Sequence, residues 1–147
     1  MKTVALRFAE NFSPTCGTIS AHEQIIESIG YVWYGKLGTR ISKKVQDAIL
    51  CSDCPKILLI NSGKPDRYWA FVKGIQNDVP SLNEIPEYYR DRCEEFKTWF
   101  MISRFEKAPN NVMSKCTVVS SGNSLGEASK HSMSPYFIIE TNEYELL

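Results

Sequence analysis

Short apolar runs separated by polar turns dominate the hydrophobic pattern of the chain. The clearest run, Lys56 to Ile60, is aliphatic at nearly every position, and Arg67 to Ile75 follows it with aromatic and β-branched residues. Asn61 to Asp66, between the two runs, is rich in turn formers, so the pattern predicts an antiparallel strand pair. Because the first strand is apolar on both faces, we expect other elements to cover it on each side.

Four more segments have the composition of β-strands, in which β-branched and aromatic side chains are frequent. They are Thr3 to Phe8, Tyr31 to Lys36, Phe96 to Glu106 and Pro135 to Glu140. In the second of these, Tyr31 and Trp33 share one face, because successive side chains of a strand point to opposite sides. Val32 and Tyr34 therefore share the other face.

Helical patterns occur between the predicted strands. Ser20 to Glu23 has the form of a capping box, with an apolar stripe behind it and Gly30 as the expected end of the helix. A second helix is expected from about Ser42 to Leu50, where apolar residues recur at helical spacing. Glu87 to Glu95 has the composition of a short charged helix.

The order of these segments predicts an α+β fold, in which a mixed curved β-sheet or a small β-barrel is flanked by short helices. One domain covering 1–147 is expected, because no internal repeat or change of composition divides the chain. A serine- and glycine-rich loop is expected at about 109–135, with a short strand from Cys116 to Val119 inside it.

The charge balance argues against a protein that holds duplex nucleic acid by bulk positive charge. The chain has 17 basic and 17 acidic residues, and several basic residues cluster at Lys36, Arg40, Lys43 and Lys44. Any anionic ligand is therefore expected to bind locally. Since the chain shows neither a signal peptide nor a run of about 18 apolar residues, we expect a cytoplasmic protein with no membrane partner.

Residues suited to acid, base or metal chemistry are sparse. Neither His22 nor His131 begins a His-x-Thr or His-x-Ser triplet of the kind used by paired-histidine phosphodiesterases. We expect His22 on the surface of the first helix and His131 in a loop. Cys51 and Cys54 form a single Cys-x-x-Cys pair, whereas a structural zinc site needs four ligands. The odd number of cysteines, 5, favours reduced thiols, and we predict no metal and no cofactor.

The segment 120–131 leaves two interpretations open. Its glycines would free backbone amides, which could bind a phosphate together with hydroxyls such as that of Ser121 and with Lys130. The segment lacks the Gly-Lys-Ser/Thr ending of a P-loop, so a flexible polar loop is the alternative. The same residues support another hypothesis, a small nuclease or hydrolase that uses His131.

Aromatic residues on the predicted strands are the most informative functional signal. Trp33, Trp69 and Trp99 all fall on strands, accompanied by Tyr31 and Tyr34. Each of them alone is more typical of a hydrophobic core. Indole and phenol groups also combine a flat apolar face with a hydrogen-bond donor, which suits stacking on a nucleobase. The basic residues that directly follow one aromatic cluster favour this second interpretation, because they would contact phosphate beside a stacked base.

The order of elements over Met1 to Glu106 resembles the PUA-like superfamily, and within it the EVE and YTH branches. The residues that carry the resemblance are the Gly30 to Trp33 sequence in one strand, Trp69 in the hairpin and Trp99 in the long strand. The resemblance implies a small β-barrel with flanking helices, and non-catalytic binding of a flipped or single-stranded base in an aromatic pocket. It implies pocket walls at Tyr31, Trp33, Trp69 and Trp99, and base-edge contacts at Asn61 and Ser62.

These observations predict a protein that binds a nucleobase or nucleotide, plain or modified, free or in single-stranded nucleic acid. The pattern favours binding over catalysis and predicts no particular oligomeric state. The predicted ligand-binding residues are Tyr31, Trp33, Tyr34, Lys36, Arg40, Asn61, Ser62, Trp69, Trp99, Ser121 and Lys130. An alternative is a phage or mobile-element anti-defence protein that sequesters a nucleotide signal in the same kind of pocket.

Overall fold

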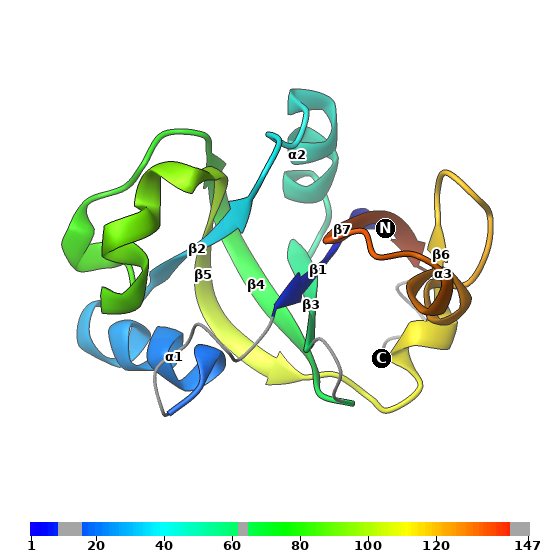
Figure 1. The fold of residues 1–147 in the computed structure, drawn as a ribbon, viewed down its shortest axis with the longest axis horizontal. Helices are drawn as coiled ribbons and strands as arrows, with labels where there is room; N and C mark the ends of the chain where they lie inside the picture. Colours follow the sequence, from blue (N-terminus) through cyan, green and yellow to red (C-terminus); the bar gives the residue numbers. More distant parts are fainter. Residues whose placement is uncertain (9–15, 62–64, 142–147) are drawn as a thin grey trace.

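A seven-stranded mixed sheet forms the centre of the protein (Figure 1). The computed structural model describes residues 1–8, 16–61 and 65–141. The strands are β1 (Lys2–Phe8), β2 (Val32–Leu37), β3 (Lys56–Asn61), β4 (Arg67–Gln76), β5 (Phe96–Lys107), β6 (Cys116–Val118) and β7 (Tyr136–Thr141). Their order in the sheet is β2-β5-β4-β3-β1-β7-β6, and only the β1–β3 pair is parallel among these neighbours. The predicted α+β class is confirmed.

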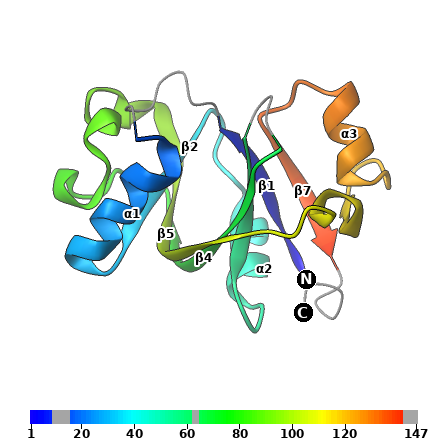
Figure 2. The ribbon, with the colours of Figure 1, turned by 90° about the horizontal axis from the view of Figure 1, so that it is seen from below.

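The predicted strand pair is present as β3 and β4, which are antiparallel with Leu58 opposite Trp69. Every residue of β3 after Lys56 is buried. One face of this strand packs in a core with α2 (Lys43–Leu50), and the other packs with β7 and α3 (Leu125–His131). Figure 2 shows α3 beside β7, at the opposite end of the molecule from α1 (Thr18–Ile29). The expectation that both of its faces are covered is therefore confirmed. Part of the predicted turn between the strands, 62–64, lies outside the described residues.

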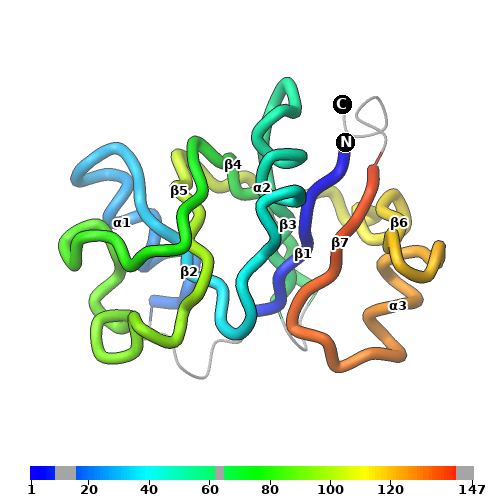
Figure 3. Tube along the Cα trace, turned by 90° about the horizontal axis from the view of Figure 1, so that it is seen from above, coloured from blue at the N-terminus to red at the C-terminus, as the bar shows by residue number. Residues whose placement is uncertain are grey.

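The sheet curls until strands that are not neighbours touch. Lys36 on β2 places its Nζ 4.2 Å from the centre of the Tyr136 ring at the start of β7. Four strands separate β2 from β7 in the sheet order, so this contact requires strong curvature. No backbone pairing joins β2 to β7 within the described strands. The sheet is therefore an open half-barrel whose seam runs between these two strands (Figure 3).

The two faces of the sheet bury different sets of residues. The first face carries the largest hydrophobic cluster, which includes Val4, Leu6 and Phe100 and is covered by the first two helices. The opposite face carries a cluster around Trp69 and Phe137, covered by α3. At the β2–β5 end, Trp33 and Trp99 join a third cluster, beneath the 3₁₀ segment that precedes β5. All three tryptophans thus belong to the second and third clusters.

Helix α1 (Thr18–Ile29) begins before the predicted capping box. Its N-cap is Gly17 and no side chain caps it, so Ser20 and Glu23 lie inside the helix and the capping-box prediction is wrong. The expected end is correct: Gly30 has φ 91°, and its backbone N–H donates to the Ile26 carbonyl. A left-handed residue at this position favours glycine.

Helix α2 (Lys43–Leu50) agrees with the second predicted helix. The Ser42 hydroxyl accepts a hydrogen bond from the Val45 backbone N–H at 3.3 Å and so caps the first turn. The predicted charged helix at Glu87 to Glu95 is present as the 3₁₀ helix η3 (Glu87–Glu95), which follows the shorter η2 (Leu82–Glu84).

Within the described residues, no helix has the length and apolar character needed to cross a membrane.

The predicted loop at about 109–135 is more regular than expected. It contains the 3₁₀ helix η4 (Val112–Lys115), strand β6 and helix α3 (Leu125–His131). The short strand predicted from Cys116 is confirmed, whereas α3 was not predicted and places His131 on a helix. The Ser124 hydroxyl caps α3 by accepting from the Glu127 backbone N–H at 3.2 Å. Leu125 is fully buried against the second face of the sheet, which fixes the helix there.

Candidate functional site

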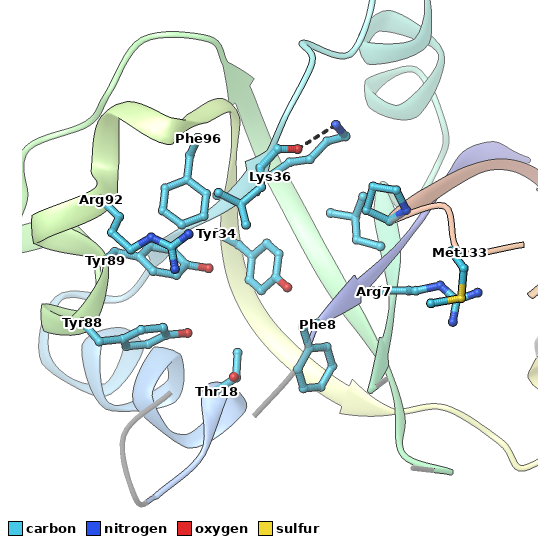
Figure 4. A pocket seen from close by; sticks show the side chains of 14 residues that line it. Arg7, Phe8, Thr18, Tyr34, Lys36, Tyr88, Tyr89, Arg92, Phe96 and Met133 are labelled. Atoms are coloured by element: carbon cyan, nitrogen blue, oxygen red, sulfur yellow. Dashed lines mark hydrogen bonds between the residues drawn. The ribbon is translucent and has the colours of Figure 1, made fainter. Parts of the chain in front are cut away.

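A cavity of about 420 Å³ lies at the seam of the half-barrel (Figure 4). Its walls come from β1, the start of α1, β2, η3, the start of β5 and the segment that leads into β7. The lining residues are Leu6, Arg7, Phe8, Thr18, Tyr34, Gly35, Lys36, Leu37, Tyr88, Tyr89, Arg92, Phe96, Met133 and Pro135. Its volume is within the range typical of small-molecule sites, roughly 300–1,000 Å³.

Strand alternation explains how β1 and β2 contribute to the cavity. Leu6 and Phe8 are two residues apart on β1, and Tyr34 and Lys36 are two residues apart on β2, so each pair shares a face. These side chains approach one another across the seam, because the sheet curls there. The unpaired edge of β2 thereby forms part of a cavity wall.

Three aromatic rings from η3 and the start of β5 form the opposite wall. Tyr89 lies 4.8 Å from Tyr88 and 4.5 Å from Phe96 between ring centres. The hydroxyl ends of Tyr88 and Tyr89 point toward the cavity (Figure 4). Burial raises the pKa of Tyr89 well above its usual range, although a hydrogen bond with the Gly35 backbone opposes this rise. Tyr89 thus stays a neutral phenol that ties η3 to the edge of β2.

Gly35 allows this wall to approach β2 closely. A Cβ atom on Gly35 would lie 2.7 Å from the Cγ and Cδ1 atoms of Phe96, which is shorter than real Cβ contacts. The phenyl ring therefore occupies the space that any side chain at position 35 would need. The glycine is required by packing, since Gly35 is not among the glycines with positive φ.

Lys36 is buried in the cavity wall, with 5% of its surface exposed. Its Nζ donates to the carbonyl oxygens of Leu37 at 3.1 Å and Thr39 at 2.8 Å, and it lies over the Tyr136 ring. Burial lowers the pKa of the amine from its usual value. The ammonium group therefore joins the two sides of the seam instead of extending into solvent.

Arg7 faces away from the aromatic wall, toward the segment after α3 (Figure 4). Its Nη2 donates to the carbonyls of Ser129 at 2.8 Å and Ser132 at 2.9 Å, and its Nε donates to Ser134 at 2.9 Å. The guanidinium also lies 5.6 Å from the centre of the Phe137 ring. Arg7 thus holds the end of α3 and the adjoining wall of the cavity in place.

Arg92 lines the cavity and is paired with Glu95. Its Nε donates to Oε2 of Glu95 at 2.7 Å and its Nη2 donates to Oε1 at 3.5 Å. This pairing raises the pKa of Arg92 and lowers the pKa of Glu95. Both side chains are about half exposed, so the pair adds little to stability, but it places a carboxylate beside the guanidinium.

His22 lies behind the aromatic wall and is completely buried. The expectation of a surface position was wrong, because α1 turns this residue toward the interior. Nδ1 lies 2.9 Å from the Thr18 carbonyl, while Nε2 has no hydrogen-bond partner among the described residues. Burial lowers the pKa of His22 to about 4, and the Thr18 hydrogen bond only partly opposes this. The imidazole packs among Tyr34, Tyr88, Tyr89 and Phe105.

Of the predicted ligand-binding residues, Tyr34 and Lys36 line the cavity. The other predicted pocket walls do not line it. Trp99 and Trp33 pack under η3, and Trp69 lies in the cluster covered by α3, with Lys56 Nζ 4.6 Å from its ring centre. The Tyr31 hydroxyl donates a hydrogen bond to the Glu84 carboxylate, which raises the pKa of Tyr31. The tryptophans therefore fill the core beside and behind the cavity.

The remaining predicted residues are dispersed. Arg40 is exposed before α2, and Asn61 is buried next to Phe8 in the β1–β3 pair without lining the cavity. Ser121 lines a separate, more open depression beside α3, together with His131. Lys130 is exposed on α3, 3.8 Å from Glu127. Ser62 lies outside the described residues.

Several lining residues were missed in the sequence. Phe8 and Phe96 lie on predicted strands, and Tyr88 and Tyr89 lie on the predicted charged helix. The sequence therefore predicted the element that carries each residue, but not that all four line one cavity. The adjacent tyrosines in an otherwise charged segment were a signal, because such a segment has little other means of packing on a sheet. Packing of η3 against β2 brings Tyr88 and Tyr89 to the cavity, and the curl of the sheet brings Phe8 to it.

Candidate metal and thiol chemistry finds little support in the described part of the chain. No group of three or more His, Cys, Asp or Glu residues is arranged there to hold a metal ion. Cys51 and Cys54 are exposed free thiols at the end of α2. Cys116 is buried, and burial raises its pKa to about 11, which keeps its thiol protonated and unreactive.

The fold and the cavity together define a small α+β half-barrel domain with an aromatic site at its seam. The family model described as Pua-like matches residues 4–144, and the chain therefore belongs to the PUA-like family. Neither the search of curated proteins nor the search of solved structures gives a significant match. Membership of the EVE or YTH branch stays a prediction.

Proposed function

We propose that the protein binds a nucleobase, as a nucleoside, a nucleotide or an unpaired residue of single-stranded nucleic acid, in the cavity at the seam. The observation that carries the proposal is the set of rings Phe8, Tyr34, Tyr88, Tyr89 and Phe96 around one cavity of suitable size. Flat aromatic side chains bind bases by stacking, which contributes about 1–3 kcal/mol for each base. Nucleic-acid binding is also common among PUA-like domains.

The geometry supports a site different from the one that the resemblance implied. Tyr34 would contact the base, whereas Lys36 would hold the seam instead of contacting phosphate. Phe8, Tyr88 and Phe96 would take the part assigned to the tryptophans. Tyr88 is the most suitable stacking partner, since it is only partly buried and its hydroxyl end faces the cavity. Sequestration of a free nucleotide signal uses the same site and stays a prediction about the ligand's source.

Catalysis by His131 gains no support from the geometry. The imidazole is on α3, 3.6 Å from Oε2 of Glu127 with its side chain 78% exposed, and it does not line the aromatic cavity. An exposed histidine beside one exposed carboxylate lacks the enclosed surroundings that tune a catalytic group. Binding without chemistry therefore remains the proposal.

Calorimetric titration with the four ribonucleosides, their monophosphates and short single-stranded oligonucleotides tests the proposal. We expect at least one base to bind, and Tyr88→Leu to weaken that binding by roughly tenfold through loss of stacking. Trp69→Phe is the matched control, because Trp69 lies in a cluster behind the sheet and should leave the affinity unchanged. Absence of binding by every base-containing compound, or a larger effect of Trp69→Phe than of Tyr88→Leu, would refute the proposal.

A further inference from the structure

The cations in the cavity wall are already neutralised or satisfied by the protein itself. A phosphate site normally presents arginine or lysine donors, or free backbone amides, that point at the ligand. In this cavity Arg7, Lys36 and Arg92 are the charged lining residues. Each of them makes hydrogen bonds to other groups of the protein.

Arg7 directs its Nε and Nη2 donors to three carbonyls on the α3 side of β1. Two of these bonds, to Ser129 and Ser132, share Nη2, and Nε completes the set by donating to Ser134. Turning the guanidinium toward a ligand would leave three carbonyls without this donor and release one wall of the cavity. Arg7 therefore serves as a positioning residue for the segment that carries Met133.

Lys36 is committed in the same way. Two donors reach the Leu37 and Thr39 carbonyls, and the ammonium group rests on the Tyr136 ring. Only 5% of the residue is exposed, so a phosphate would have to enter a buried position to reach it. The desolvation of that phosphate would oppose binding.

Arg92 is the third charged lining residue, and it is paired with Glu95. The carboxylate contacts both Nε and Nη2, which is the bidentate geometry that a phosphate would use. A phosphate that approaches Arg92 would meet the negative charge of Glu95 at the same donors. A cationic ligand is disfavoured as well, because no carboxylate is among the described residues that line the cavity.

We propose that the cavity accepts the uncharged base or nucleoside part of its ligand and leaves phosphate groups outside. This inference rests on the proposed base binding and adds the class of ligand to it. Aromatic faces and phenol hydroxyls then supply the contacts inside the cavity, and ionic attraction supplies little. Affinity follows the base, and the phosphorylation state of the ligand matters little.

Calorimetric titration with each ribonucleoside and its 5′-monophosphate tests the inference. A phosphate that met an available guanidinium would bind about tenfold or more tightly than the nucleoside, as hydrogen bonds to charged groups usually contribute. We expect a difference of less than about fivefold and little change with salt. A monophosphate preferred by about fivefold or more would overturn the inference while leaving base binding intact. Absence of binding by both forms of every base would refute the proposed function as well.

A pair of isomeric probes and one variant sharpen the test. N6-methyladenosine and 1-methyladenosine have the same atoms, but only the second carries a positive charge at neutral pH; we expect the neutral isomer to bind more tightly, and the reverse order would count against the inference. Arg92→Gln should change nucleoside and monophosphate affinity by the same factor. A selective loss of monophosphate affinity in this variant would show that Arg92 holds the phosphate.

Discussion

Protonation of His22 is expected to make the stability of this protein fall as the pH is lowered below 7. In the folded state the imidazole is completely buried among aromatic rings, and burial lowers its pKa from 6.5 to about 4. In the unfolded chain the same group would titrate near its ordinary value. Between these two values the unfolded state binds the proton and the folded state does not, so acid favours unfolding.

The expected size of this effect follows from the difference between the two pKa values. The folded state keeps His22 neutral, and this costs no stability above pH 6.5. The free energy of unfolding then decreases progressively as the pH falls from 6.5 toward 4. The loss amounts to about 2 kcal/mol between pH 7 and pH 5, and to about 3 kcal/mol once the folded-state pKa is passed. Such a loss is a large fraction of the stability of an ordinary domain, about 5–15 kcal/mol.

Urea denaturation at a series of pH values measures the effect directly. In His22→Phe, which keeps a ring in the aromatic surroundings but cannot bind a proton, the decline between pH 7 and pH 5 should shrink by about 2 kcal/mol. His131→Phe is the matched control, because it makes the same substitution at an exposed histidine. If both variants lost stability with acid as steeply as the unaltered protein, the assigned role of His22 would be wrong. Should His22→Phe not fold, His22→Gln offers a second residue that does not titrate.

Three further substitutions or labels test local parts of the structure. Gly35→Ala should destabilise the protein by about 1–3 kcal/mol in urea denaturation, because its Cβ would overlap a phenyl ring. Gly74→Ala should cost less, because its Cβ would lie 4.0 Å from the Cβ of Met101, an ordinary contact. Equal losses in the two glycine variants would contradict the packing argument. Ser124→Ala should cost about 1 kcal/mol through loss of the α3 cap, whereas Ser20→Ala should cost nearly nothing. A larger loss of stability in Ser20→Ala than in Ser124→Ala would show that Ser20 caps α1 after all. Iodoacetamide should leave Cys116 unlabelled in the folded protein and label it only after unfolding; rapid labelling would show that its burial and raised pKa are misassigned.

Local sequence patterns were sufficient for most of the sheet. The strand from Phe96 and the pair formed by β3 and β4 were predicted because their β-branched and aromatic composition extends over many residues. Helix starts were harder. The same Ser-x-x-Glu pattern occurs at Ser20 and Ser124, and it caps a helix only at Ser124. At α1 the chain becomes helical earlier, which places Ser20 inside the helix where its hydroxyl has no free amide to cap.

The sequence by itself determined which side chains share a face of each strand. It placed Tyr34 and Trp33 on opposite faces of β2. The structure agrees, since the tyrosine lines the cavity and the tryptophan packs under η3. Only the tertiary structure decided which of those faces would border a cavity. That choice depends on the curl that brings β2 to Tyr136 and on the packing of Tyr88 and Tyr89 against a strand edge distant in sequence. The alternation of side chains along one strand carries no information on the curvature of the sheet. Curvature arises from contacts between strands that are distant in the sequence and meet only in the folded protein.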